Sequence, residues 1–121
     1  MKMLRLYADE SGESHFGADD IPLNLEDDSP PAKPHYFSDP QDASTYVLVE
    51  CPLGWGGELH PAPRRQIVVC TAGTMRVTTS LGESRDLGPG DAMLLEDTSG
   101  KGHISLVTST TPFRGLIVRL E

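Results

Sequence analysis

The sequence predicts an all-β fold, a single domain built as a sandwich or a closed barrel. The length of 121 residues suits one domain that can bury a core without disulfides. Twelve glycines and ten prolines interrupt the chain so often that long helices have little room. Between these breaks lie about eight short apolar or alternating segments at fairly even spacing, a pattern typical of sandwiches and barrels.

The expected strands are the segments rich in β-branched and apolar residues. The first covers residues 2–7, and a polar turn or hairpin loop follows at residues 8–14. The other expected strands lie at residues 46–51, 67–71, 75–79, 84–87, 92–95, 103–108 and 113–120. Closing such a sheet removes its exposed edges and leaves an interior lined by every second residue. We expect a ligand to bind in that interior.

The chain divides into an N-terminal arm, residues 1–44, and a barrel, residues 45–121. The arm is acidic and proline-rich, and one or two of its strands are expected to pack on the barrel. Its segment 26–44 contains four prolines, which predict an extended connector that wraps the outside of the domain.

Charge and composition exclude several classes of partner. Residues 1–42 carry ten acidic and three basic side chains, and the whole chain has a formal net charge of −8. Because such acidity repels phosphate groups, neither nucleic acid nor an anionic membrane is an expected partner. No apolar run is long enough to span a bilayer and no signal-peptide core is present, so we expect a cytoplasmic protein. Cys51 and Cys70 lie in apolar segments, which favours reduced core thiols.

The candidate binding residues begin at His60. If the segment 60–70 is regular, His60, Arg64 and Gln66 share the inward face while Arg65 faces solvent. An inward Arg64 would fix a substrate carboxylate by a bidentate contact, and the alternative is a surface ion pair. Trp55, shortly before His60, either walls the entrance of the pocket or packs on the sheet.

Two more candidates come from turns. Glu96 would form an acid–base pair with His103, whose ordinary pKa suits proton transfer near neutrality. The alternative is a solvated turn in which Asp97 caps backbone donors. His15 would reach the pocket if the N-terminal strand crosses the barrel, and it would otherwise be an exposed loop histidine.

The order of these residues resembles the two-motif pattern of the cupins, over about residues 45–120. The segments His60-Pro-Ala-Pro-Arg-Arg-Gln66 and 94–103 are similar to segments of short microbial cupins. The resemblance implies a double-stranded β-helix, or jelly-roll barrel, with an extended N-terminal arm. It also implies His60, Gln66 and His103 as ligands of one divalent transition metal, namely iron, manganese, zinc or nickel. By their chemistry alone, two imidazoles and an amide oxygen suit such an ion, and Glu96 would add a carboxylate. Ala62 stands where metal-binding cupins have another histidine, and the alternative is a partly polar cavity without metal.

The expected function is that of a small cupin that binds a small polar or anionic organic molecule in its barrel. Proton-transfer chemistry of the isomerase, lyase or cyclase type is the leading expectation, with or without assistance from a metal. His60 and His103 would be the acid–base or metal-bearing groups, and Gln66 would orient them. A metal-dependent oxygenase is less favoured because the histidine set is incomplete. The alternative is a non-catalytic ligand-binding or sensor module. We expect a homodimer formed through edge strands, with or without exchange of the first strand, since such edges pair readily.

Overall fold

The computed structural model describes all 121 residues and contains no helix, so the all-β prediction is confirmed. The strands are β1 (Lys2–Ala8), β2 (Ser14–Asp20), β3 (Asn24–Glu26), β4 (His35–Phe37), β5 (Thr45–Cys51), β6 (Gln66–Ala72), β7 (Met75–Thr79), β8 (Ser84–Leu87), β9 (Ala92–Glu96), β10 (His103–Val107) and β11 (Phe113–Arg119). Every strand expected from the sequence is present, to within a residue at each end. The chain has no helix of the length and apolarity that a bilayer crossing requires.

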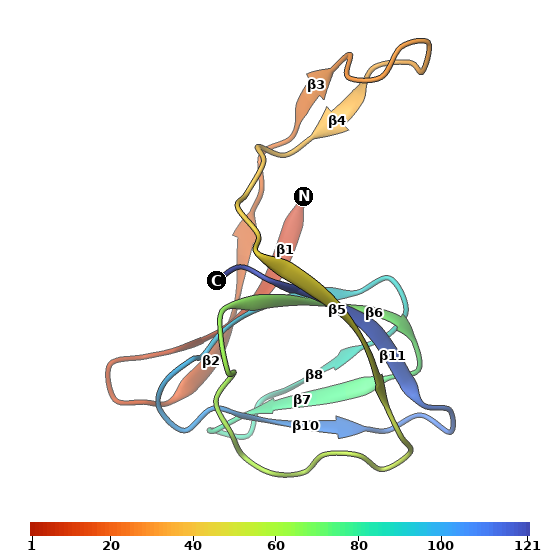
Figure 1. Cartoon of the computed structure of the whole chain (residues 1–121). Helices are drawn as coiled ribbons and strands as arrows, with labels where there is room; N and C mark the ends of the chain where they lie inside the picture. The colour runs from red at the N-terminus through yellow and green to blue at the C-terminus, as the bar shows by residue number, and fades with distance from the viewer.

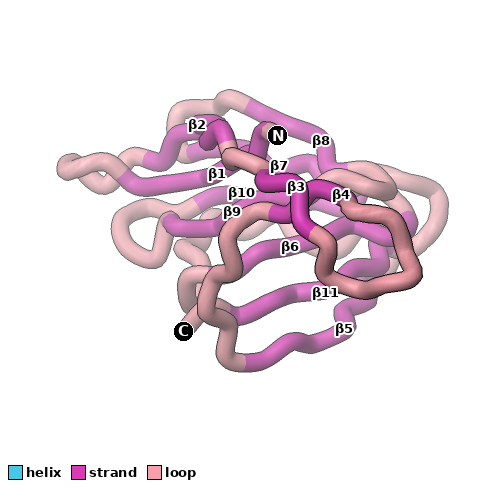
Figure 2. Tube along the Cα trace, turned by 90° about the horizontal axis from the view of Figure 1, so that it is seen from above, coloured by secondary structure: helices cyan, strands magenta, loops and turns pink.

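Two sheets face each other and form a jelly-roll barrel (Figures 1 and 2). The larger sheet has six strands in the order β2-β1-β9-β6-β11-β5, and the smaller has three in the order β10-β7-β8. Neighbouring strands pair antiparallel except β1 and β9, which pair parallel. The long loop between β5 and β6 is tied to β10 by two isolated bridges, Gly56 with Leu106 and His60 with His103. This loop therefore closes one side of the barrel.

The core lies between the two sheets and follows the alternation of the strands. In β7, Met75, Val77 and Thr79 are buried while the residues between them are more exposed. Phe113 of β11 and Met93 of β9 face the same interior and are 1% and 0% exposed. Burying a side chain of this size contributes about 1.5–3 kcal/mol. Inward residues at every second position are what the pattern predicted.

The N-terminal region differs from the sequence-based expectation. Residues 14–20 form β2, which pairs with β1 along its whole length, from Lys2 with Asp20 to Ala8 with Ser14. The segment of β2 has no β-branched residue, so its own propensity gave no strand signal and pairing with β1 decides its conformation.

The expectation of a connector wrapped around the domain at residues 26–44 is wrong. Strands β3 and β4 pair as an antiparallel hairpin, and this hairpin projects away from the barrel (Figure 1). The prolines of this segment lie in the loop between the two strands and in the chain after them. No proline therefore removes an N–H donor from the pairing of β3 with β4. Residues 1–20 belong to the six-stranded sheet, so from here on the name arm is kept for residues 21–44 alone. Within it only Ile21 and Phe37 are partly buried.

Candidate active site

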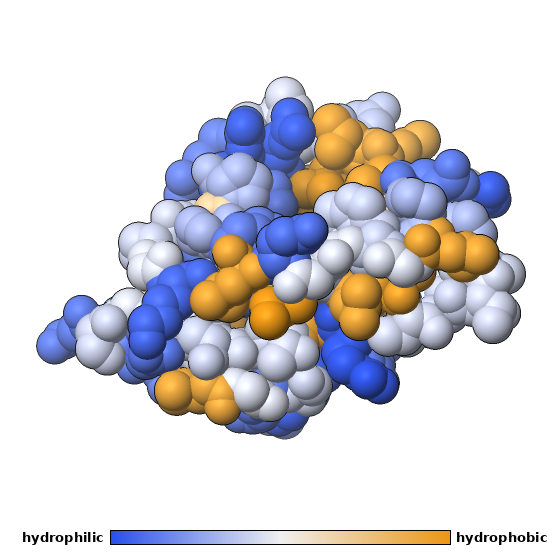
Figure 3. Space-filling view, turned by 90° about the horizontal axis from the view of Figure 1, so that it is seen from below, coloured by the Kyte–Doolittle hydropathy of each residue, from blue (hydrophilic) through white to orange (hydrophobic).

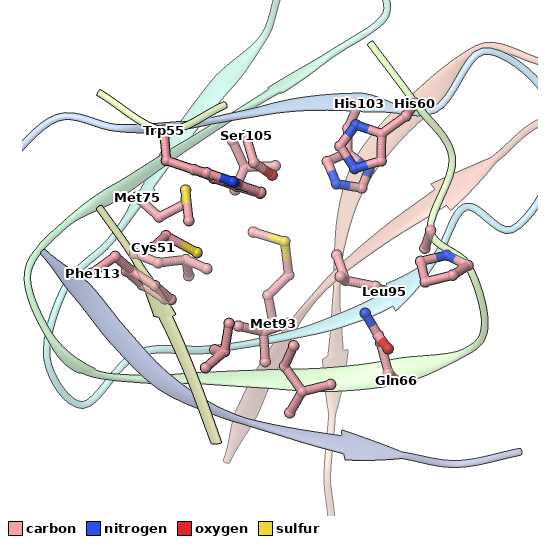
Figure 4. A pocket seen from close by; sticks show the side chains of 17 residues that line it. Cys51, Trp55, His60, Gln66, Met75, Met93, Leu95, His103, Ser105 and Phe113 are labelled. Carbon is pink, nitrogen blue, oxygen red and sulfur yellow. The ribbon is translucent and has the colours of Figure 1, made fainter. Parts of the chain in front are cut away.

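A cavity of about 250 Å³ lies between the two sheets. Seventeen residues line it, and twelve of them are hydrophobic. The polar groups on its wall come mainly from His60, Gln66, His103 and Ser105. In Figure 4 both histidine rings lie at one end of the cavity, while Met75, Cys51 and Phe113 lie at the other. The site is therefore an apolar cavity with one polar end.

The histidine end is built by a backbone bridge between the β5–β6 loop and the start of β10. The His60 amide donates to the His103 carbonyl at 3.0 Å, and the His103 amide donates to the His60 carbonyl at 2.9 Å. Gly102 permits this approach: it has φ +78°, and a Cβ there would lie 2.0 Å from the His60 carbonyl carbon. The two rings are consequently held with their centroids 5.0 Å apart.

His103 is oriented by a buried carboxylate that the sequence analysis did not select. The ring Nδ1 donates to Oδ2 of Asp97 at 2.5 Å, and the two side chains are 4% and 0% exposed. With the proton fixed on Nδ1, the ring presents an unprotonated Nε2. The second carboxylate oxygen of Asp97, Oδ1, has no hydrogen-bond partner. The expectation that Asp97 lies in a solvated turn is wrong.

His60 is fixed in a similar way but at the exposed end of the wall. Its ring Nδ1 donates to the carbonyl oxygen of Glu58 at 2.8 Å. Its Nε2 is then the free ring nitrogen, as it is in His103. Two imidazoles with free Nε2 atoms therefore share one end of the cavity, and only His103 has a carboxylate behind it.

Glu96 does not belong to the cavity, so its expected pairing with His103 is wrong. Its carboxylate accepts hydrogen bonds from Arg5 at 2.9 Å and from Arg65 at 2.8 Å. Burial raises the pKa of Glu96, but the hydrogen bonds from Arg65 and Arg5 outweigh it and lower that pKa overall. Met93 and Leu95 of β9 face the cavity. Because the side chains of a strand alternate between its two faces, the next inward position after 93 and 95 is residue 97. Extending this alternation past the strand would have pointed to Asp97 as the partner of His103.

Gln66 and Trp55 both lie on the cavity wall, as expected. Gln66 is 7% exposed, and its amide points into the cavity below the histidines (Figure 4). Trp55 is 43% exposed and lines the region near Ser105. It comes from a loop whose Leu53 and Leu59 are also exposed, on the side of the molecule where Figure 3 shows separate apolar patches.

Arg64 and His15 lie outside the cavity, so the expected contacts of both with substrate are wrong. Arg64 is exposed because the strand begins only at Gln66, and the proline-containing segment before it does not keep the alternation. The His15 ring instead bonds through Nε2 to Oδ2 of Asp9 at 2.6 Å. This contact with His15 is the largest of several that lower the pKa of Asp9. No lysine or arginine lines the cavity.

The three expected metal ligands, His60, Gln66 and His103, all contribute to the cavity wall. The carboxylate behind His103 is the kind of second partner that metal-bound histidines commonly have. The set of metal-binding groups is nevertheless incomplete, because the cavity wall offers two imidazoles and an amide but no carboxylate. Nowhere in the chain do three or more His, Cys, Asp or Glu side chains form a group that could hold a metal ion. These residues do not fit the usual three-ligand site, and metal binding stays a prediction.

Comparison with known proteins finds likeness in solved structures. One is a protein of Neisseria meningitidis, 18% identical, with a TM-score of 0.47 over 63% of this chain and 72% of that one. Another is a cupin protein of Bacteroides fragilis, 19% identical, with a TM-score of 0.47 over 70% of this chain and 81% of that one. No family model matches the sequence, and no curated protein matches it. At these identities the likeness concerns the fold alone, and the all-β jelly roll is evident in the chain's own two facing sheets.

Proposed function

We propose that this chain binds a small organic molecule in its cavity and catalyses proton transfer on it, with His103 as the acid–base group. The observation that carries the proposal is the buried contact between Asp97 and the Nδ1 of His103. A carboxylate in that position holds the imidazole in one tautomer and stabilises the imidazolium that forms when the ring accepts a proton. The proton is exchanged at Nε2, the nitrogen left free.

His60 supplies a second acid–base group at the same end of the cavity. The centroid of its ring lies 5.0 Å from the centroid of the His103 ring. His60 is exposed, whereas His103 is buried. A proton taken from one position of the substrate by Nε2 of His103 can be replaced at another position by the imidazolium form of His60, which has taken a proton from solvent on Nε2; His103 then returns its proton to solvent. That sequence is an isomerisation, and the loss of a leaving group protonated by His60 is an elimination.

The cavity wall indicates which small molecule suits the site. Its apolar part, with Met93 and Phe113, favours a hydrocarbon or aromatic portion in the substrate. Gln66 and the histidines favour one hydrogen-bonding group, such as a carbonyl, at the polar end. The substrate proposed is thus more apolar than the polar or anionic molecule expected from the sequence, because Arg64 does not contribute a cation to the wall.

Deuterium exchange tests the proposal. The protein is incubated in D2O with small ketones of different shape, namely methyl isobutyl ketone, phenylacetone and cyclohexanone, and NMR follows the loss of the proton next to the carbonyl. We expect exchange with at least one ketone, slowed by roughly 100-fold or more in His103→Gln because general acid–base groups contribute that much. Asp97→Asn should slow it less, and the matched control Arg64→Ala, outside the cavity, should leave it unchanged.

The same experiment addresses the alternative of a non-catalytic binding or sensor module. If ketones that shift the cavity resonances in NMR are not exchanged faster than in buffer, the enzyme proposal is overturned and the binding module replaces it. Equal exchange rates in wild type and His103→Gln would also overturn it, because the rate would then owe nothing to the ring.

A further inference from the structure

The outer side of the six-stranded sheet carries an apolar surface that the single chain leaves uncovered. Hydrogen-bonded register places two rows of side chains side by side across β5, β11 and β6. We call this surface the outer face; its residues are Tyr46, Val118 and Ile67 in one row, and Leu48, Leu116 and Val69 in the other. Tyr46 is 72% exposed and Leu48 is 81% exposed.

The outer face is unusual for an antiparallel sheet with water on one side. Such sheets normally alternate apolar inward residues with polar outward ones. Here the inward residues of β11 and β6, such as Ile117 and Val68, line the cavity, and their outward neighbours are apolar as well. A sheet with two apolar faces is typical of a sheet that is covered on both.

The arm carries a second uncovered apolar surface. Leu25 and Tyr36 are directly paired across β3 and β4, and they are 59% and 65% exposed. Leu23 just before them is 39% exposed. The arm points away from the barrel, so its tip does not reach the outer face of its own chain (Figure 1). Only its base borders the sheet. Residues 21–22 and 38–41 form a groove with Ile67 and Leu94, and residues 43–44 lie in a second groove with Tyr46, Leu116 and Val118.

Charged groups border both surfaces. The arm has five acidic residues and one lysine. At the β1 side of the outer face, Arg5 and Arg65 share the single carboxylate of Glu96, and Asp19 lines the same groove as Arg65. The two guanidinium groups are the contacts that this rim offers to the acidic residues of the arm, and such contacts steer association and fix its register.

From these surfaces we infer that two copies of this chain form a dimer in which the arm of each lies on the outer face of the other. A single two-fold operation covers both surfaces of both copies, which is how isologous dimers are built. The 24 residues of the arm, 21–44, and the six of the outer face set an upper limit of 30 residues per partner, which lies within the roughly 20–30 that each partner contributes to a stable interface. The inference is independent of the proposed catalytic function, because neither surface lines the cavity.

Two double variants test whether each arm lies on the outer face of the other copy. The arm variant combines Leu25→Glu with Tyr36→Glu, and the face variant combines Tyr46→Glu with Leu48→Glu. All four side chains are exposed in the single chain, so both variants should fold; circular dichroism verifies this. The matched control is Leu81→Glu, in the turn between β7 and β8, where the side chain is 65% exposed.

Sedimentation velocity over a concentration series gives the readout. We expect wild type and Leu81→Glu to be dimers, and each double variant to have a dimer dissociation constant raised by at least roughly 10-fold. An equimolar mixture of the two variants should associate again, since one intact arm then meets one intact face.

Three results would overturn the inference. One is a wild-type chain that stays monomeric throughout the series. Another is an arm variant that dimerises like wild type, which would indicate sheet-to-sheet packing without the arm. The third is a mixture of the variants that remains monomeric.

Discussion

The main chains of His60 and His103 hydrogen-bond each other in both directions, at 3.0 and 2.9 Å, although the two residues are far apart in the sequence. This contact is one of two isolated bridges between the β5–β6 loop and β10, and the Ala62 amide of the same loop donates to the Asp97 carbonyl at 3.0 Å. The position of the two rings therefore depends on how closely the two backbones approach.

Gly102→Ala should break this approach. Its Cβ would meet the His60 carbonyl carbon at 2.0 Å, and its φ is +78°. Gly82→Ala is the matched control, because that glycine has φ +93° but open space around its Cβ position. The control should cost about 1–2 kcal/mol of unfolding free energy, the cost of a left-handed conformation. Gly102→Ala should cost more and shift the His60 and His103 ring resonances. Urea denaturation measures the unfolding free energy of both variants. Equal losses in Gly102→Ala and Gly82→Ala would show that the backbone moves apart at position 102 without further cost.

Asp97→Ala should destabilise the fold by about 1–3 kcal/mol, because it leaves the buried Nδ1–H of His103 without an acceptor. In the wild type, nitrogen-15 NMR of the neutral His103 ring should show the proton on Nδ1. Asp97→Asn keeps the volume and provides a carbonyl oxygen, so it should retain more stability than the alanine variant. A wild-type ring protonated on Nε2 would contradict the orientation of the proposed acid–base group.

Glu96→Gln should change how stability depends on pH. The pKa of Glu96 is lowered in the folded chain, so the ionised form stabilises the fold above the ordinary value of 4.5. That contribution is lost as pH falls below 4.5 through the lowered folded value. The variant should therefore be less stable near neutrality and lose less stability on acidification. Thermal unfolding from pH 7 to 3 measures this, with exposed Glu10→Gln as the control. Parallel curves for wild type and Glu96→Gln would contradict the role of the two arginines.

Cys51 should react with small neutral thiol reagents faster than Cys70. Burial raises the pKa of both thiols, so both should react slowly at neutral pH until the chain unfolds. Only Cys51 lines the cavity, which gives methyl methanethiosulfonate a path to it. Mass spectrometry of peptides gives the two rates. Faster labelling of Cys70 would show that the cavity does not admit small molecules from solvent.

Metal binding by His60, Gln66 and His103 is tested by loading the protein with iron, manganese, zinc or nickel and passing it through gel filtration. A bound metal should elute with the protein and be lost in the double variant His60→Ala and His103→Ala, with His15→Ala as control. Because the set lacks a carboxylate, we expect a weak site that retains less than one equivalent of metal after the column. Tight retention of one equivalent in wild type would require further ligands beyond those on the cavity wall.

Much of the fold follows from local patterns. The apolar and β-branched segments between glycine and proline breaks gave the positions of the eight barrel strands. The positions of Gln66, His60 and His103 on one cavity wall were also predictable, because the family resemblance brings both motifs together. The strand β2 could not be found in this way, since its stability comes from pairing with β1 rather than from its own residues.

What the sequence determined by itself is the alternation within each strand and the places where it is broken. Only the tertiary structure decided which face of each strand is inward, because both faces of β9 and β6 contain apolar residues and the choice depends on pairing with distant strands. That choice places Asp97, and not Glu96, behind His103. It also leaves Arg64 in solvent, since the chain before Gln66 is not a strand and carries no alternation. The direction of the arm was likewise decided by the fold, because β3 and β4 pair with each other and with no strand of the barrel.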